Sequence, residues 1–284
     1  MLNQTNYKKK KTLILVESLS NDKTVAKKSI INKFTSNVKG KKFIKSDTNN
    51  HHGSEGHWLE VLMGIEPNCD NAPDNCGWEQ KKDSKKITFG DWQASAYLFT
   101  SKKRRDKNGV SNEDISSVYM KRDEFIKAFG SPNPEKNNRY SWSGSVFPKY
   151  SNAYNYAGQR MTFLDNDDLI IEYSYINDSR EDKVIPIELR TNEPSVIAIW
   201  KKDKLEKHIK NKFGVNGFYI CKKDVNGCYD KICFGDALDF EYFKNQVKNG
   251  IIYLDSGMYE TNSRNYSQFR ADQSLWYDLV TEEF

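Results

Sequence analysis

The sequence predicts an α/β or α+β fold, in which a mixed β-sheet is flanked by helices and two lobes surround a cleft. Apolar residues recur at helical spacing over residues 22–34, and runs of β-branched and aromatic residues follow between 169 and 200. Aromatic residues make up 13% of the chain, which argues against disorder. A chain of 284 residues can form one large domain or two lobes.

The first half of the chain is expected to combine helices with one strand pair. Residues 22–34 form a helix with an apolar stripe, and residues 56–65 form a short amphipathic helix that stops at Gly64. Residues 78–82 and 87–92 supply the β-favouring residues of a strand pair. A further helix is expected over residues 113–129.

The second half is expected to alternate strands and helices. Asn226-Gly227 is the strongest short signal, because this dipeptide favours the tight turn of a β-hairpin. The elements expected here are strands at 169–175, 184–190 and 196–200, a helix at 202–213, the hairpin 217–222 with 229–234, a helix at 237–248, a strand at 251–254 and a helix at 272–282.

Charge and cysteine content restrict the class of protein. The net charge is +5, and lysine and arginine cluster at 8–11, 39–42, 102–105 and 201–202. A fold that gathers these clusters along one cleft would neutralise phosphates, whereas scattered clusters would only be solvated. The five cysteines show no Cys-x-x-Cys spacing, which argues against structural zinc and for free thiols in a reducing cytoplasm. No run is long enough to cross a membrane, so we expect a cytoplasmic protein.

The chemistry is predicted to centre on Asp74, Glu79 and Lys81. Only Asp74 has an acid five residues later and a lysine two beyond that. Within a strand Glu79 and Lys81 point to the same face, and Asp74 would face the same point from a turn or a neighbouring strand. Two carboxylates there suit Mg²⁺, and the ammonium can hold a water or offset charge on a phosphate. The alternative is a solvated hairpin with ordinary surface charges.

Glu60 is the third acid of this region. It lies in the predicted helix 56–65 among apolar neighbours, an unusual place for an acid without a partner. A metal ion or a lysine would explain it. Alternatively, Glu60 occupies the solvent face of the helix.

These motifs resemble the PD-(D/E)XK nuclease superfamily, and more narrowly its MutH and MvaI/BcnI branch. Residues 73–81 resemble the Pro-Asp-x-x-Gly-Trp-Glu-x-Lys segment of MvaI-like enzymes, with Gln80 where many relatives carry an apolar residue. Residues 250–257 and 264–270 resemble the C-terminal end of that family. The helix pattern Gly-x-x-Leu-Glu-x-x-x-Gly is matched by Gly56, Leu59, Glu60 and Gly64.

The resemblance implies a Type II restriction endonuclease that hydrolyses double-stranded DNA at a short specific sequence with Mg²⁺, leaving a 5′-phosphate and a 3′-hydroxyl. Asp74 and Glu79 would bind the metal, Lys81 would orient the attacking water, and Glu60 would support that water or hold Lys81. One domain over residues 1–284 would contain a catalytic lobe including about 50–130 and a recognition lobe including much of 131–284. A monomer and a cognate DNA methyltransferase are also implied.

Recognition of the DNA sequence is expected to depend on arginines outside the catalytic motif, because arginine pairs bidentately with guanine. The candidates are Arg264 and Arg270, followed by Arg139 and Arg160. Two alternatives stay open: a MutH-like strand-specific nicking enzyme of mismatch repair, and a non-catalytic DNA-binding module. A second catalytic lysine like that of MutH is not identified, and Lys85 and Lys86 are candidates only by proximity.

Overall fold

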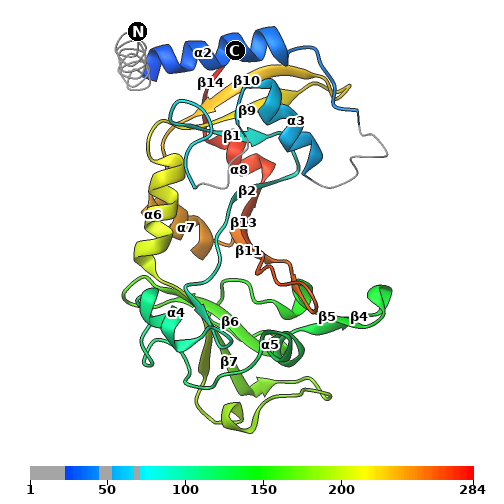
Figure 1. The fold of residues 1–284 in the computed structure, drawn as a ribbon, viewed down its shortest axis with the longest axis vertical. Coiled ribbons are helices and arrows are strands. Elements are labelled where there is room, and N and C mark those ends of the chain that lie inside the picture. The colour runs from blue at the N-terminus through cyan, green and yellow to red at the C-terminus, as the bar shows by residue number, and fades with distance from the viewer. Residues whose placement is uncertain (1–22, 45–52, 67–70) are drawn as a thin grey trace, which may run out of the picture. The chain divides into compact units, whose positions relative to one another are not determined.

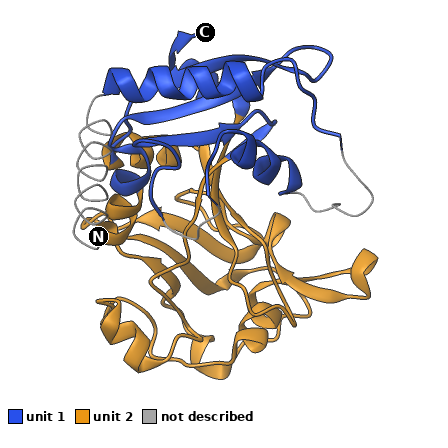
Figure 2. Cartoon of the chain, turned by 45° about the horizontal axis from the view of Figure 1, so that its top comes forward, with its two compact units in different colours: residues 1–87, 209–239, 273–284 blue, residues 88–208, 240–272 orange. Residues whose placement is uncertain are grey.

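The computed structural model describes residues 23–44, 53–66 and 71–284, and the chain divides into two units that each combine separate stretches of sequence (Figure 2). Unit 1 comprises residues 1–87, 209–239 and 273–284, and unit 2 comprises residues 88–208 and 240–272. Among the described residues, no helix has the length and apolar character needed to span a bilayer.

Unit 1 is built on a four-stranded sheet in the order β1-β9-β10-β14 (Figure 1). Strand β1 (Trp78–Lys82) runs parallel to β9 (Gly217–Lys223), and β9 forms an antiparallel hairpin with β10 (Tyr229–Gly235). The edge strand β14 (Val280–Glu283) pairs antiparallel with β10. The predicted hairpin is therefore confirmed, and Gly227 in its turn has a φ of 81°, which favours glycine.

Helices α2 (Lys23–Asn37) and α3 (Ser54–Leu62) pack on one face of this sheet, where their apolar residues meet those of the strands. Ile30 and Phe34 of α2 share a buried cluster with Trp78, Tyr219 and Phe234. This burial supplies most of the driving force that holds the two helices on the sheet. The other face carries Phe218, against whose ring Trp276 of α8 (Gln273–Asp278) packs edge-on.

Unit 2 contains three sheets around an aromatic core. The largest has the order β3-β8-β7-β6, with antiparallel pairing throughout. Phe125 packs edge-on against both Tyr97 and Trp142 in the core. The strands of the unit are β2 (Lys86–Asp91, from the unit boundary), β3 (Ala96–Tyr97), β4 (Ser131–Asn133), β5 (Arg139–Trp142), β6 (Ala157–Phe163), β7 (Leu169–Asp178), β8 (Ser195–Trp200), β11 (Ile252–Ser256), β12 (Met258–Tyr259) and β13 (Ser267–Asp272).

The helices of unit 2 are short. They are α4 (Lys102–Lys107), α5 (Arg122–Phe129) and α7 (Phe240–Lys248), with 3₁₀ turns η1 (Pro134–Lys136), η2 (Gly144–Val146) and η3 (Ile187–Leu189). Helix α6 (Lys202–Phe213) begins in unit 2 and ends in unit 1, within the predicted range 202–213. The prediction of a mixed α/β fold is thus confirmed.

Three predicted elements are wrong in type or extent. The strand expected at 184–190 is irregular and contains η3, because Pro186 has no N–H for a ladder and Val184 and Ile187 are exposed. The helix expected at 113–129 shortens to α5, because the segment before α5 lies beside β8, where Ser116 N donates a hydrogen bond to Val196 O. The helix expected at 272–282 ends at Asp278, and the β-branched residues after it join the sheet as β14.

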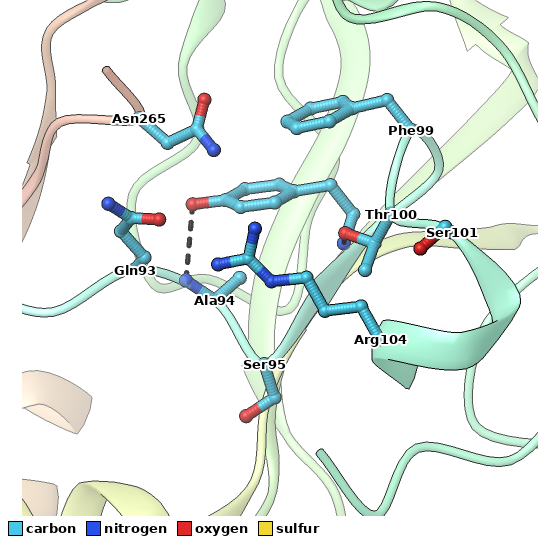
Figure 3. A pocket seen from close by; sticks show the side chains of 9 residues that line it. Gln93, Ala94, Ser95, Phe99, Thr100, Ser101, Arg104 and Asn265 are labelled. Carbon is cyan, nitrogen blue, oxygen red and sulfur yellow. Dashed lines mark hydrogen bonds between the residues drawn. The ribbon is translucent and has the colours of Figure 1, made fainter. Parts of the chain in front are cut away.

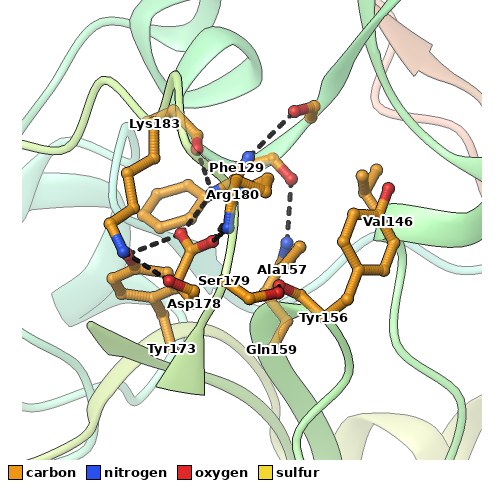
Figure 4. Close-up of polar contacts among 12 residues, drawn as sticks. Phe129, Val146, Tyr156, Ala157, Gln159, Tyr173, Asp178, Ser179, Arg180 and Lys183 are labelled. Atoms are coloured by element: carbon orange, nitrogen blue, oxygen red, sulfur yellow. Dashed lines mark hydrogen bonds and ion pairs between the residues drawn. The ribbon is translucent and has the colours of Figure 1, made fainter. Parts of the chain in front are cut away.

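A buried charge network fixes the end of β7 (Figure 4). Asp178 has a fully buried side chain and accepts hydrogen bonds from Arg180 Nη2 at 2.7 Å and Tyr173 Oη at 2.8 Å. Arg180 also donates to the backbone oxygens of Ala128 and Gly130 at the end of α5. Burial alone would raise the pKa of Asp178, but the hydrogen bonds from Arg180 and Tyr173 outweigh it and hold that pKa below its usual value.

We therefore expect Asp178→Asn to lower the free energy of unfolding by about 3–5 kcal/mol, because it leaves the Arg180 charge without its partner. Since the folded-state pKa is depressed, this contribution is present above the unfolded pKa, near 3.9, and is lost as the pH falls through the folded value. Urea denaturation at pH 7 and at pH 3 measures both effects. Asp182→Asn at an exposed position is the matched control, and an equal loss in both variants would contradict the expectation.

Candidate active site

Strand β1 directs its side chains alternately to the two faces of the sheet of unit 1. Trp78 belongs to the core shared with α2 and α3, and Gln80 Oε1 accepts a hydrogen bond from Tyr219 Oη at 2.7 Å. Glu79 and Lys81 point to the opposite face, where the Lys81 ammonium lies near the rings of Phe213 and Trp276. The alternation thus separates a packing face from a charged face.

Glu79 is a carboxylate almost without exposure, at 3%, and two lysines hold it. Its Oε1 accepts from Lys81 Nζ at 2.9 Å and lies 3.1 Å from Lys212 Nζ. Its Oε2 is buried and has no hydrogen-bond partner among the residues that the structure describes. A buried carboxylate oxygen without a donor is costly, so this atom is available to a cation.

Lys81 is buried beside this carboxylate, at 5.1 Å from the ring centroid of Phe213 and 5.6 Å from that of Trp276. Burial lowers the pKa of the Lys81 ammonium, the charge of Glu79 opposes that shift, and the positive charge of Lys212 adds to it. The aromatic rings restrict the position of the ammonium and stabilise its charge. Lys81 therefore has a defined place beside Glu79.

Asp74 reaches the same site from the turn before β1. Its Oδ2 accepts from Gln80 N at 2.9 Å, and the turn is closed by paired backbone hydrogen bonds between Asn75 and Trp78. Gly77 has a φ of 81°, and a Cβ there would lie 2.7 Å from Asn216 Nδ2, so only glycine fits. This turn determines where Asp74 lies.

The surroundings of Asp74 disfavour its charged form. Burial raises the pKa of Asp74 to about 7, and the negative charge of Glu79 contributes in the same direction. Lys81 and Lys212 offset only part of this effect. Two carboxylates that repel each other in a buried place are typical of a site that binds a cation.

Glu60 lies on α3 at the edge of this group, with its side chain 39% exposed. Its Oε2 is 3.8 Å from His57 Nδ1, one turn back on the helix. Burial raises the pKa of Glu60, and the charge of Glu79 also raises it while Lys212 lowers it. The charges of Glu79 and Lys212 therefore act on the pKa of Glu60, although its side chain is partly exposed to solvent.

The donor set fits a hard divalent cation. Among the described residues, no group of three or more His, Cys, Asp or Glu side chains could hold a metal ion. The site instead offers oxygens of Asp74 and Glu79, including the unpartnered Glu79 Oε2. Mg²⁺ is commonly bound by one or two carboxylates, with its other positions filled by water and phosphate oxygens.

Lys212 is a member of this site that no local sequence pattern indicates. It comes from the last turn of α6, which leads into β9, the strand parallel to β1. The candidates Lys85 and Lys86 are exposed and lie beyond the end of β1. Only knowledge that β1 and β9 are neighbours would have indicated Lys212 in advance.

The four arginines proposed to read DNA lie in unit 2 and make separate contacts. The Arg139 guanidinium is 3.7 Å from the ring centroid of Tyr259, and the Arg160 guanidinium pairs with Glu172. The two others form ion pairs at 3.0 Å, Arg270 Nη1 with Asp255 and Arg264 Nη2 with Asp91. Arg264 has the most exposed of these side chains, at 57%, and is the most accessible to a ligand.

Comparisons with known proteins identify the family. A family model described as LlaMI restriction endonuclease matches residues 38–284. The Type II restriction enzyme ScrFI of Lactococcus lactis subsp. cremoris is 43% identical over 275 residues, which cover 90% of this chain and 97% of that protein. The structure of restriction endonuclease MvaI in a complex with cognate DNA aligns with a TM-score of 0.55 and 12% identity, over 92% of this chain and 97% of that one. The last match supports the fold.

We expect Mg²⁺ to raise the thermal unfolding midpoint of the protein, because an ion that binds only the folded state stabilises that state. At an ion concentration about 100 times the dissociation constant, the gain is about 2.7 kcal/mol. Asp74→Asn and Glu79→Gln should each remove most of this gain. Differential scanning fluorimetry with Mg²⁺ and with a chelator measures it. Asp230→Asn, an exposed change in the same unit, should keep the full shift, and an equal shift in all variants would contradict the site.

Proposed function

The chain belongs to the LlaMI restriction endonuclease family, and from this premise we propose that it is a Type II enzyme that hydrolyses double-stranded DNA at a short specific sequence. One observation carries the proposal. Glu79 is buried between Lys81 and Lys212, and Asp74 lies close enough for the charge of Glu79 to raise the pKa of Asp74. The match to ScrFI, a Type II restriction enzyme, supports it over the length of the chain.

The proposed cofactor is Mg²⁺, held by Asp74 and by Glu79 through its unpartnered Oε2. When bound, such an ion stabilises negative charge on a phosphate and lowers the pKa of coordinated water. The hard oxygen donors of these two residues favour Mg²⁺ over softer metals. Backbone hydrogen bonding from Gln80 N keeps Asp74 oriented toward the site.

The side chains of the site have distinct tasks in the proposed reaction. Water attacks phosphorus in line with the leaving 3′-oxygen, the P–O3′ bond breaks, and the products carry a 5′-phosphate and a 3′-hydroxyl. Lys81 orients the attacking water and stabilises charge on the phosphate, held in place by Phe213 and Trp276. Glu60 at the edge of the site accepts a hydrogen bond from water.

Lys212 is assigned a second role in stabilising charge. It shares the Glu79 oxygen with Lys81, so the two ammonium groups together compensate the buried carboxylate. An ammonium at this position also adds positive potential where negative charge develops on phosphate. We propose Lys212 as the second catalytic lysine, in place of Lys85 and Lys86.

The remaining assignments follow from the same proposal. The catalytic lobe includes the segment from Glu60 to Lys81 in unit 1, and the recognition lobe includes the candidate arginines of unit 2. The enzyme would act as a monomer in the cytoplasm, where a cognate DNA methyltransferase protects the host sequence. The family match favours this reading over a mismatch-repair nicking enzyme and over a non-catalytic DNA-binding module.

Digestion of a mixed DNA substrate with Mg²⁺, followed by sequencing of the ends of both strands, tests the proposal. We expect breaks in both strands at one short sequence, with 5′-phosphate ends. Lys81→Ala should abolish cleavage while a gel-shift assay still detects binding, because this residue acts in chemistry. Breaks in one strand only would support the nicking enzyme, and the lack of any cleavage with Mg²⁺ or Mn²⁺ would contradict the proposal.

Lys212→Ala should lower the rate of cleavage about 10²-fold or more, the usual effect of removing one stabilising donor from an active site. Lys85→Ala removes the same charge from an exposed position and should change the rate little. Single-turnover kinetics on the identified target compares the two, with the unfolding midpoint of each variant as a check on folding. Equal rates for both variants would exclude a catalytic role for Lys212.

A further inference from the structure

A pocket of about 200 Å³ opens on unit 2 (Figure 3). It is lined mainly by polar side chains, together with the buried ring of Tyr97 and the partly exposed ring of Phe99. Ligand clefts for drug-sized molecules are usually about 300–1,000 Å³, so this pocket suits a single planar group. The lining residues that matter for its chemistry are Gln93, Phe99, Thr100, Arg104 and Asn265.

One wall of the pocket is held by a buried arginine. Arg105 is 5% exposed, and its Nε donates to Thr100 O at 3.0 Å. Its Nη2 donates to Leu98 O at 3.1 Å, and its Nη1 donates to Ser116 O at 3.1 Å. The backbone that carries Phe99 and Thr100 is therefore fixed before any ligand arrives, which lowers the entropy cost of binding.

A second arginine holds the opposite wall. Arg122 donates from Nη2 to Arg264 O at 3.0 Å and from Nη1 to Tyr259 O at 3.0 Å. Its Nε donates to Asn265 Oδ1 at 2.8 Å. Because the amide oxygen of Asn265 is used in this way, its NH₂ group is the end left for a ligand.

The pocket is consequently rich in hydrogen-bond donors. Asn265 and Arg104 enter it from different sides (Figure 3). Across the part of the chain that the structure describes, the Arg104 guanidinium and the Gln93 amide form no side-chain hydrogen bond or ion pair. Arginine and amide donors match an edge with two adjacent acceptors, and guanine presents N7 and O6 in this way.

A base edge fits this pocket better than a backbone phosphate does. Two of the polar groups are neutral amides, and the Phe99 ring, stacked at 4.7 Å on Tyr97, forms an apolar wall. An apolar wall excludes water and strengthens neutral hydrogen bonds, whereas a phosphate would find compensating charge only in Arg104 among the lining residues. Asn265 also directly follows Arg264, the most exposed of the four arginines proposed to read DNA.

We propose that this pocket reads a guanine of the target, with Asn265 Nδ2 and Arg104 as donors to its N7 and O6. This inference rests on the proposed function, because it assumes a duplex DNA substrate. It makes Arg104 and Asn265 specificity-determining residues. The candidate Arg264 then gains a second role, since its backbone oxygen anchors the wall that presents Asn265.

The test pairs protein variants with altered bases. Asn265→Asp keeps an oxygen that accepts from Arg122 Nε, so the wall stays in place, and it replaces the Nδ2 donor by a charged oxygen that repels the acceptor edge of guanine. Each guanine of the identified target is replaced in turn by 7-deazaguanine, which lacks the N7 acceptor. At one position we expect this replacement to slow wild-type cleavage about tenfold. Asn265→Asp or Arg104→Ala should already be slow on guanine and should lose most of the response at that position.

Lys103→Ala is the matched control, because it removes the same charge as Arg104→Ala from the neighbouring exposed residue of α4. It should keep the response to 7-deazaguanine. If Arg104→Ala instead lowers cleavage of all sequences equally and reduces the salt dependence, the contact is to phosphate and the inference is wrong. If wild type cuts specifically but no guanine position couples to either variant, the inference fails while the proposed function stands. If wild type cuts no duplex, both fail.

Discussion

The burial of Glu79 between two ammonium groups is the interaction on which the rest of unit 1 depends. A carboxylate with 3% exposure would cost several kcal/mol if it were unpaired. Lys81 comes from the same strand as Glu79. Lys212 lies beside Glu79 because α6 leads into β9 and β9 pairs in parallel with β1. The sheet order therefore assembles the charges, and the apolar residues of α2, α3 and α8 hold that order in place.

In unit 2, side-chain hydrogen bonds hold irregular segments in one conformation. Three buried or partly buried arginines do this by donating to backbone carbonyls in loops and at the ends of short helices and strands: Arg105, Arg122 and Arg180. The planar guanidinium has five donors in a fixed fork, against three on a lysine ammonium, and can satisfy several carbonyls at once. Exposed groups such as Arg104 and Asn265 are thereby presented on fixed walls. Binding groups held in this way lose little entropy when a ligand arrives.

The local parts of this design could be predicted from the sequence. The period-two alternation indicated that Glu79 and Lys81 share a face, and Asn226-Gly227 indicated the hairpin. Lys212 could not be predicted, because its place depends on a parallel pairing between strands far apart in sequence. The strand expected at 184–190 was wrong because β-branched residues there indicated a strand, whereas Pro186 has no N–H for a ladder and Val184 and Ile187 are exposed. Interactions close in sequence carry a local signal, and those that depend on topology do not.

If Asp74 and Glu79 together hold a divalent cation, anomalous diffraction from crystals grown with Mn²⁺ will locate it. We expect one strong anomalous peak within coordination distance of an Asp74 carboxylate oxygen and of Glu79 Oε2, the atom that has no partner among the described residues. Glu79→Gln crystals grown in the same way should lose that peak. If the peak is missing at saturating Mn²⁺, or lies near neither carboxylate, Asp74 and Glu79 do not bind the cation.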